Sequence, residues 1–292
     1  MLHRSFSLPN LGDASAARQK PTEDASNDDV VSLSDVSASS PRSVERLQLT
    51  FNELSVDTPL KERVVSALQH ALTQALPPVE IVSLEANIAA GKSTLMDSLK
   101  RRYSTNEPDV LFLDEPVEKW MDAGLLQAFY RKEIEPAPFQ LAVLMSLAGP
   151  LFRAVNARPK LVIAERSPWS NFHTFAKVNL SGQDLNAYSY TFNELLAALP
   201  PVKVHMVYLK VSVATALARI QSRSRDSEDS VPEVYMQRLH DAHESLAEVA
   251  KPHRVITVDA ERSPSEVLTD VTHTIDEILS QYACNVYIPP GA

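Results

Sequence analysis

Cysteine and glycine are scarce in this sequence. Cys284 is the only cysteine among 292 residues, so no disulfide can form within the chain, which fits a reducing compartment. Glycine occurs only 6 times in the whole chain. A glycine that is missing from one particular loop is therefore weak evidence against a motif there.

Uninterrupted apolar runs long enough to cross a bilayer are also missing. The richest apolar stretch, residues 141–155, is interrupted by Ser146, by Gly149 and Pro150, and by Arg153. We therefore expect a core helix with a kink in this stretch, and no membrane partner.

The sequence has no excess of basic residues. Its net charge is −9 and its isoelectric point is about 5.4. These values argue against a protein that coats nucleic acid through a basic surface, although they leave room for a local phosphate site. With 44% hydrophobic residues the chain can bury a substantial core, and its length allows one large domain or two.

The first 57 residues are rich in Ser, Asp, Ala and Pro and lack periodic apolar positions. This composition predicts a disordered tail, followed by one domain over residues 58–292. Thr58 and Pro59 are a start signal for a helix that reaches Leu76. The tail has no clear amphipathic, Arg-rich helix, so we expect the protein in the cytoplasm, with mitochondria as the alternative.

One short motif lies in this tail. Residues 4–9 read Arg-Ser-Phe-Ser-Leu-Pro, which resembles a 14-3-3 ligand when Ser7 is phosphorylated. An Arg-rich groove would read the phosphoserine. In a Ser-rich tail, a chance match is the alternative interpretation.

The rest of the chain alternates between short apolar runs and helical patterns. The expected strands are 80–84, 110–113, 161–164, 204–209 and 255–258. The expected helices are 93–103, 139–155, 183–198, 213–222, 232–249 and 264–282. This alternation predicts an α/β fold with a five-stranded parallel sheet and helices on both faces. In such sheets, ligands bind beyond the carboxyl ends of the strands.

The most informative motif follows the first expected strand. Residues 86–94 are Ala86, Asn87, Ile88, Ala89, Ala90, Gly91, Lys92, Ser93 and Thr94. A loop of this kind wraps phosphates with its backbone N–H groups, while Lys92 reaches the β- and γ-phosphates and Ser93 holds Mg²⁺. The usual pattern, G-x-x-x-x-G-K-[ST], has a glycine where this chain has Ala86. A decayed loop and an ordinary helix start are the alternatives.

Acids and arginines follow the later strands. Glu115 comes after the second strand, Glu165 and Arg166 come after the third, and an arginine-rich run, 219–225, ends the helix after the fourth. Phosphoryl transfer needs such residues, because cations neutralise the transferring group and carboxylates orient the acceptor or hold Mg²⁺. Each residue alone could instead be a solvated loop acid or a surface ion pair.

Five motifs in this order resemble the deoxyribonucleoside kinase family, which includes thymidine, deoxycytidine and deoxyguanosine kinases. They are residues 84–94, Glu-Pro-Val-Glu-Lys-Trp at 115–120, Phe-Gln at 139–140, Glu-Arg-Ser at 165–167 and Arg-Ser-Arg at 223–225. The resemblance covers about residues 79–260. It implies a P-loop kinase that uses ATP as phosphate donor and Mg²⁺ as cofactor.

The resemblance also implies roles for single residues. Glu115 would take the proton from the nucleoside 5′-hydroxyl, and Arg166 would bridge that hydroxyl and Glu115. Glu165 would position Mg²⁺ together with Ser93. Arg219, Arg223 and Arg225 would form a lid over ATP. The substrate pocket would comprise Trp120, Tyr130, Phe139, Gln140, Val143, Leu147, Asn171, Phe175 and Glu228.

Within that pocket, Tyr130 and Glu228 would hold the sugar 3′-hydroxyl, and the Gln140 amide would pair with the base edge. Phe175 and Phe139 would sandwich the base, with Trp120 at its edge. Core packing is the alternative for the aromatic residues. Val143, Leu147 and Asn171 match positions that set base preference, and the apolar Leu147 favours a pyrimidine or broad substrate range.

Several positions depart from the family pattern. Ala86 and Ala89 replace two glycines. Two alternatives are open for position 86: its Cβ crowds the phosphate or strains the turn, or it is tolerated because the backbone there suits a residue with a Cβ. Ser227 replaces the first of two paired glutamates in the lid. These departures leave two alternatives open: a structural relative without catalysis, such as the accessory subunit of mitochondrial complex I that has this fold, or another small-molecule P-loop kinase. Family members are commonly homodimers, which we also expect here.

Overall fold

The computed structural model describes residues 77–104, 107, 109–223, 231–251 and 253–285. The expected tail with its Ser7 motif, the helix 58–76, and the lid residues Arg225, Ser227 and Glu228 lie outside these ranges. The side chain of Arg223 is likewise not described.

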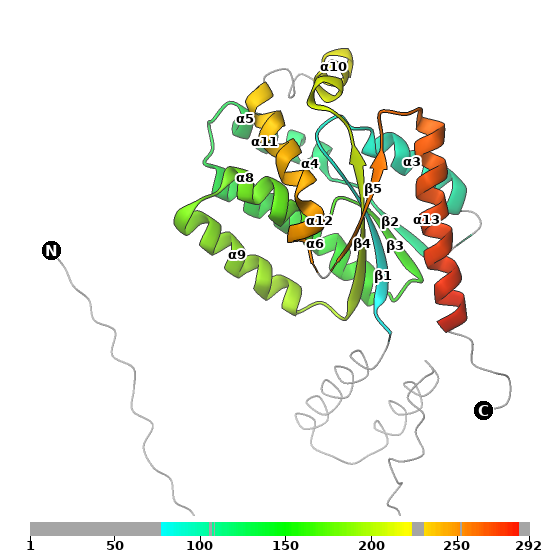
Figure 1. The fold of residues 1–292 in the computed structure, drawn as a ribbon. Helices are drawn as coiled ribbons and strands as arrows, with labels where there is room; N and C mark the ends of the chain where they lie inside the picture. Colours follow the sequence, from blue (N-terminus) through cyan, green and yellow to red (C-terminus); the bar gives the residue numbers. More distant parts are fainter. Residues whose placement is uncertain (1–76, 105–106, 108, 224–230, 252, 286–292) are drawn as a thin grey trace, which may run out of the picture. The chain divides into compact units, whose positions relative to one another are not determined.

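Five parallel strands form one sheet in the order β2-β3-β1-β4-β5. The strands are β1 (Val79–Ala86), β2 (Val110–Leu113), β3 (Leu161–Glu165), β4 (Val202–Lys210) and β5 (Arg254–Asp259). This confirms the predicted α/β fold class and the five-stranded sheet. The central strand β1 therefore delivers its carboxyl end to the middle of the sheet edge (Figure 1).

The longer helices match the expected ranges within a few residues. They are α3 (Lys92–Tyr103), α6 (Pro136–Asn156), α9 (Gly182–Ala197), α10 (Val213–Arg223) and α13 (Pro264–Asn285). The expectation of one helix over 232–249 is wrong, because the segment divides into α11 (Glu233–Glu244) and α12 (Leu246–Val249). The Ser245 hydroxyl, at the junction, donates to the Ala242 carbonyl, which is a local bond that competes with helix continuation.

Five short elements were not expected from the sequence. They are α4 (Val117–Asp122), α5 (Leu125–Tyr130), α7 (Pro168–Asn171), the π-helix η2 (Phe172–Ala176) and α8 (Lys177–Asn179). Elements of three to six residues carry no usable hydrophobic period, so periodicity does not reveal them. All five lie in the segments that follow β2 and β3. A π-helix in such a place often marks a functional site.

Helices cover both faces of the sheet (Figure 1). Alternate residues of β1 point to opposite sides: Val82 and Leu84 pack with α3, α10 and α13, whereas Val79 and Ile81 pack with α6 and α12. Among the described helices, α6 alone is long and apolar enough to cross a membrane, but half of its apolar window is buried inside the fold. A core helix gives the same result, and the expected absence of a membrane partner stays a prediction.

Candidate active site

The backbone strain in the loop after β1 lies at Ala89 and not at Ala86. Ala86 is the last residue of β1, fully buried, and its φ is not positive, so a Cβ there does not strain the turn. Instead, Ala89 has φ 60° and Gly91 has φ 99°. A left-handed alanine costs on the order of 1–3 kcal/mol. Of the two alternatives for position 86, the structure supports the one in which the backbone suits a residue with a Cβ, and Ala89 is the departure that the loop must support.

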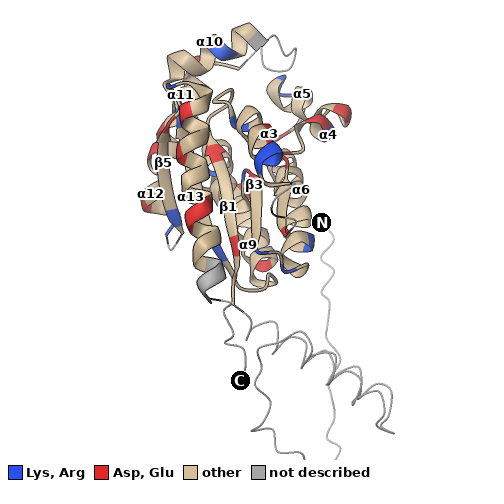
Figure 2. Ribbon diagram, turned by 90° about the vertical axis from the view of Figure 1, so that its right-hand side faces the viewer, with Lys and Arg blue, Asp and Glu red and all other residues tan. Residues whose placement is uncertain are grey.

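The side chains of this loop fix its shape. Asn87 accepts a hydrogen bond from the Ile88 N–H at 2.8 Å and donates to the Met236 carbonyl on α11 at 3.0 Å. Gly91 caps α3, so that the helix points its N-terminus at the space inside the loop. That end of a helix attracts phosphate. Figure 2 shows basic residues on α3 and α10; on α3, Lys100, Arg101 and Arg102 belong to the last turn, at the end of the helix away from the loop.

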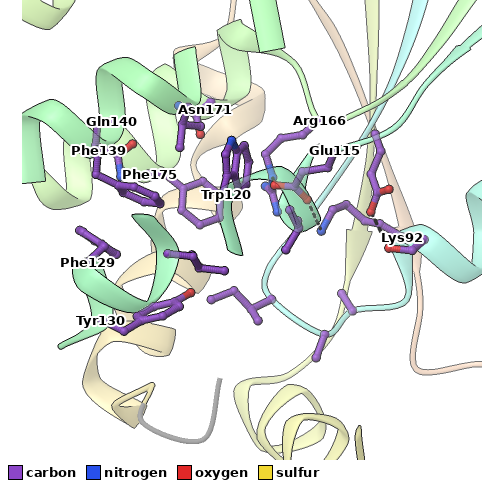
Figure 3. A pocket seen from close by; sticks show the side chains of 18 of the residues that line it. Lys92, Glu115, Trp120, Phe129, Tyr130, Phe139, Gln140, Arg166, Asn171 and Phe175 are labelled. Carbon is purple, nitrogen blue, oxygen red and sulfur yellow. Dashed lines mark hydrogen bonds and ion pairs between the residues drawn. The ribbon is translucent and has the colours of Figure 1, made fainter. Parts of the chain in front are cut away.

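Lys92, Glu115 and Arg166 form a charged cluster beside the loop (Figure 3). Arg166 Nε donates to Glu115 Oε1 at 2.7 Å, and Lys92 Nζ lies 3.9 Å from Glu115 Oε2. All three side chains are nearly buried, with Glu115 the most open at 12%. Burial, and next the charge of Arg166, lower the pKa of Lys92. Burial opposes the charge of Arg166, but the carboxylates of Glu115 and Glu85 outweigh it and raise the pKa of Arg166.

Arg166 is held in a strained geometry. Its φ is 71°, its N–H donates to the Leu84 carbonyl at 3.0 Å, and its Nη1 donates to the Ala86 carbonyl at 3.2 Å. A left-handed non-glycine residue persists only when its surroundings fix it, and such strain is concentrated at functional sites. The contacts to β1 therefore tie Arg166 directly to the start of the phosphate loop.

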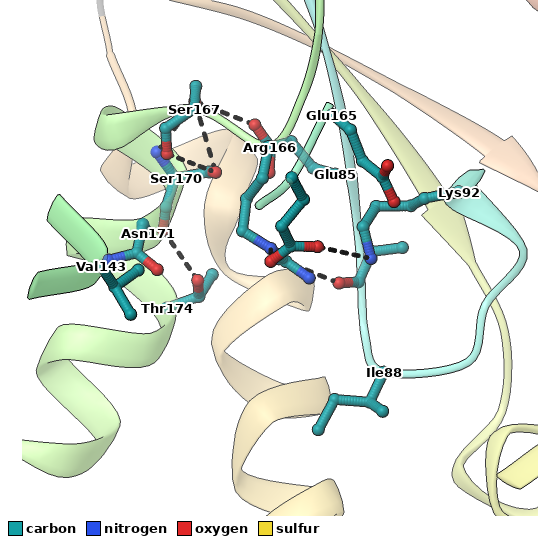
Figure 4. A network of polar contacts seen from close by, with 12 residues as sticks. Glu85, Ile88, Lys92, Val143, Glu165, Arg166, Ser167, Ser170, Asn171 and Thr174 are labelled. Carbon is teal, nitrogen blue, oxygen red and sulfur yellow. Dashed lines mark hydrogen bonds and ion pairs between the residues drawn. The ribbon is translucent and has the colours of Figure 1, made fainter. Parts of the chain in front are cut away.

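Glu85 supports this arrangement and was not singled out from the sequence. It is fully buried, and its Oε1 accepts hydrogen bonds from Ser83 at 2.7 Å and Ser167 at 2.9 Å (Figure 4). Burial raises the pKa of Glu85, although the charge of Arg166 opposes the shift. Because Ser167 follows Arg166 in the chain, Glu85 anchors the β3 end against β1.

Ser93 and Glu165 provide the oxygens expected for a metal. Ser93 Oγ donates to Glu165 Oε1 at 2.8 Å, and Glu165 ends β3 with 6% of its surface exposed. A hydroxyl and a carboxylate fit Mg²⁺, which keeps several waters and uses one or two carboxylates together with substrate phosphates. Within the described ranges no group of three or more His, Cys, Asp or Glu side chains forms a complete metal cage. The residues present thus fit a metal that arrives with phosphates.

A cavity opens from the charged cluster between the loop after β1 and the helices α4, α5, α6 and η2 (Figure 3). Its lining includes most of the expected residues: the loop residues 88–94 together with Glu115, Trp120, Tyr130, Phe139, Gln140, Val143, Glu165, Arg166, Asn171 and Phe175. Val117, Leu126, Phe129 and Tyr235 also line it, and sequence reasoning missed them. Leu147 does not line this cavity but packs with Trp120 and Val143 in the apolar cluster beside it.

The aromatic rings of the cavity do not leave Phe139 and Phe175 as two free faces on either side of a base. Phe129 stacks on Phe139, with 4.4 Å between centroids and 17° between planes, so one face of Phe139 is already covered. Trp120 meets Phe139 edge-on, and its Nε1 donates to Ser146 Oγ at 3.0 Å. Phe175 lies under the Arg166 guanidinium, 4.3 Å from Cζ to the ring centroid. This cation–π contact joins the aromatic wall to the charged cluster.

Phe175 is itself braced by a second ring on α11. His243 is fully buried, meets Phe175 edge-on at 5.9 Å and stacks on Tyr208 of β4 at 5.6 Å. Burial, and next the charge of Arg166, lower the pKa of His243 to about 3. His243 is therefore a neutral ring, and the stack Tyr208–His243–Phe175 connects the sheet to Arg166.

Arg219 lies at a second cavity on the other side of the loop. It donates to the carbonyls of Ala90 and Ala260, at 3.3 and 3.1 Å. This cavity is lined by Ala89, Gly91 and Thr94 of the loop and also by Ser222, Arg262 and Pro264. Arg262, which sequence reasoning did not include, is the second cation here. The lid roles of Arg219, Arg223 and Arg225, and that of Glu228 at the sugar, stay predictions.

The sequence of this chain is similar to known kinases. Residues 82–281 match the family model described as deoxynucleoside kinase. The chain is 34% identical over 209 residues to kinase protein 029R of invertebrate iridescent virus 3, covering 70% of this chain and 97% of that protein. It is 26% identical over 200 residues to human deoxycytidine kinase, covering 57% of this chain and 75% of that enzyme.

A solved structure also shares the fold. The chain aligns with the deoxyadenosine kinase of M. mycoides, which was solved with dCMP and dCDP bound, at a TM-score of 0.57. The alignment covers 68% of this chain and 99% of that one, at 22% sequence identity.

Proposed function

The chain belongs to the deoxynucleoside kinase family, and we propose that it transfers the γ-phosphoryl group of ATP to the 5′-hydroxyl of a deoxyribonucleoside. We propose further that it accepts pyrimidines or a broad range of bases and acts in nucleotide salvage. The observation that carries the proposal is the cluster of Lys92, Glu115 and Arg166, which lies where the phosphate loop meets the aromatic cavity.

Glu115 is suited to receive the proton in this reaction. The 5′-oxygen would form a bond to the γ-phosphorus, the bond from that phosphorus to the β,γ-bridging oxygen would break, and ADP would leave. The proton would pass to Glu115, which is the most open member of the cluster and faces the cavity. Arg166, fixed by Ala86 and Leu84, would hold Glu115 and the reacting hydroxyl in line.

The phosphates would be held by the loop and its flanking cations. Lys92 would neutralise the β- and γ-oxygens, and the backbone N–H groups of the loop would bind their remaining lone pairs. Ser93 and Glu165 would hold Mg²⁺, which when bound neutralises charge on the phosphate oxygens. The second cavity, with Arg219 and Arg262, would take the rest of ATP.

Exposed apolar side chains support the proposed homodimer. Met145 of α6 is 52% exposed and Tyr190 of α9 is 68% exposed, and the two helices pack against each other. We propose that this pair of helices joins two copies of the chain. Met145→Glu should then convert a dimer to a monomer in light scattering. A chain that is monomeric before the substitution contradicts this proposal.

Two proposals rest on the tail sequence. Cytoplasmic location, with mitochondria as the alternative, can be checked by imaging the full chain with a C-terminal tag. Binding of a 14-3-3 protein at phosphorylated Ser7 can be checked with phosphorylated and unphosphorylated peptides of residues 1–20. Equal and negligible binding of the two peptides contradicts it.

The kinase itself is tested with the purified full chain, ATP and Mg²⁺. Thymidine, deoxycytidine, deoxyadenosine and deoxyguanosine are offered separately, and the nucleoside monophosphate is identified by mass spectrometry. Product with the native chain, and about 10²–10⁴-fold less with Glu115→Gln, is the expected result. ATP binding without product from any nucleoside would contradict the proposal and favour the structural relative.

A further inference from the structure

One amide in the cavity wall has an unusual partner. Asn171, at the end of α7, is 1% exposed and lines the cavity close to Gln140 and Phe175 (Figure 3). Its Nδ2 donates to the hydroxyl of Tyr188 on α9 at 3.0 Å. Tyr188 is fully buried, and its ring lies parallel to Phe172 at 6.0 Å. The hydroxyl is therefore fixed behind the cavity wall, with Asn171 between it and the cavity.

This hydrogen bond leaves one group on each residue without a partner. Over the described residues no group donates to Asn171 Oδ1, and no group accepts the hydroxyl proton of Tyr188. Burial raises the pKa of Tyr188, so the hydroxyl keeps that proton. Asn171 lines the cavity whereas Tyr188 does not, so the amide is the member of the pair that a molecule in the cavity would meet.

The chemistry of the two groups allows a second arrangement. A carboxamide has a donor end and an acceptor end, and a tyrosine hydroxyl can either accept or donate. After a half-turn of the amide, the Tyr188 hydroxyl would donate to Oδ1, and Nδ2 would face the cavity. Each arrangement has one hydrogen bond between the residues, but only the second gives the buried hydroxyl proton an acceptor. The second is therefore favoured in the empty cavity by about one buried hydrogen bond, and a donor on the base edge selects the first by bonding to Oδ1.

We propose that Asn171 and Tyr188 form a reversible hydrogen-bonded pair that presents either an acceptor or a donor to the base edge. An amino-bearing base would be met by Oδ1, and a keto-bearing base by Nδ2 after the half-turn. Gln140, the other amide of the cavity, is 1% exposed, and its buried Oε1 has no partner in the described ranges, so it can turn in the same way. The inference rests on the proposed deoxyribonucleoside substrate and makes that site tolerant of both base types.

Deoxycytidine and deoxyuridine are the matched probes, because their bases differ at position 4 only in an amino or keto group and in the protonation of N3. Asn171→Asp replaces the reversible amide with a carboxylate, which only accepts hydrogen bonds. The variant should bind deoxycytidine within about threefold of the native chain and deoxyuridine about 30-fold more weakly, because the keto oxygen would face an oxygen. Calorimetric titration of the full chain measures both affinities without requiring turnover.

Tyr188→Phe tests the second half of the pair. Without the hydroxyl, both orientations of Asn171 lose their outer hydrogen bond, so both nucleosides should bind about fivefold more weakly and their ratio should stay the same. Tyr103→Phe is the matched control, since Tyr103 is also buried but its hydroxyl donates to Asp276, away from the cavity. It should leave both affinities unchanged.

The outcomes separate this inference from the proposed function. An unchanged affinity ratio in Asn171→Asp, with both nucleosides bound, overturns the reversible pair alone. Native chain that already rejects deoxyuridine also overturns it. Binding of both nucleosides without phosphorylation overturns the kinase proposal and leaves the pair standing. No binding of either nucleoside to the folded native chain overturns both.

Discussion

The two ends of the cavity are built from different kinds of interaction. At the loop end, Arg166 is fixed by an ion pair to Glu115, by two bonds to β1 carbonyls and by the ring of Phe175. At the base end, where we propose that the base binds, two amides, Gln140 and Asn171, line the cavity with aromatic rings, and no described residue donates a hydrogen bond to either amide oxygen. The first end has one geometry, whereas the second can present two. A site of this kind would keep its chemistry constant while accepting different substrates.

The largest effect is expected from replacing Arg166, the central cation of the loop end. Arg166→Gln leaves Glu115 and Glu85 without their buried cation, so unfolding free energy should fall by about 3–5 kcal/mol. Phosphorylation should fall by about 10²–10³-fold for every nucleoside. Chemical denaturation and steady-state kinetics measure the two effects. Arg153→Gln, at an exposed position of α6, is the control and should change neither.

Phe175 contacts Arg166 at the loop end and also lines the rest of the cavity, so a substitution of Phe175 should affect both ends. Phe175→Leu removes the ring under Arg166 and one stacking surface for the base. Loss of stacking and of the cation–π contact should lower kcat/KM by about 10–100-fold, with kcat and KM both affected. Full kinetics with one nucleoside will show the split. A change in KM alone would mean that Phe175 does not support Arg166.

Two alanines of the phosphate loop, Ala86 and Ala89, should respond in opposite ways to glycine. Ala86→Gly adds backbone freedom in a buried strand and should lower stability by about 1 kcal/mol. Ala89→Gly relieves a left-handed residue at φ 60°, so stability should stay the same or rise, by up to about 1 kcal/mol. Thermal unfolding of both variants tests this. Equal destabilisation would contradict the assignment of strain to Ala89.

The amino-terminal end of β1 lies at the opposite edge of the sheet from the phosphate loop, and we expect no role in catalysis for it. Glu80 accepts from His205 Nε2 at 2.6 Å and from Lys203 at 3.2 Å, and these bonds outweigh burial and lower the pKa of Glu80. A lowered carboxyl pKa stabilises the fold at neutral pH, and that stability is lost as pH falls through the folded-state pKa. Glu80→Gln should therefore cost less than about 1 kcal/mol at neutral pH and flatten the acid limb of unfolding. Kinase activity should not change.

The sequence predicted the sheet and the loop end well for physical reasons. Buried parallel strands are continuous apolar runs, and a phosphate loop needs particular residues at fixed spacing, so both leave local signals. Glu115 and Arg166 were found because each follows a strand whose end lies at the same edge. The strain at Ala89 was missed because backbone dihedrals depend on how β1 enters α3, which residue identity alone does not fix.

The base end was predicted less completely because its contacts are not local. Tyr188 and Tyr235 come from helices distant in sequence, and Phe129 belongs to a helix too short to show a period. Leu147 was placed in the pocket by resemblance, but it packs beside the pocket, against Trp120 and Val143. Family motifs locate a residue along the chain, whereas its side-chain neighbours depend on how α5, α6 and η2 pack.

The loop end should perform the same chemistry whichever base is bound. The most direct measurement is kcat for deoxycytidine and thymidine with the native chain and with Glu115→Gln. The substitution should lower kcat by the same factor, about 10²–10⁴, for both nucleosides. A loss that differs more than fivefold between the two, or no loss for either, would contradict it.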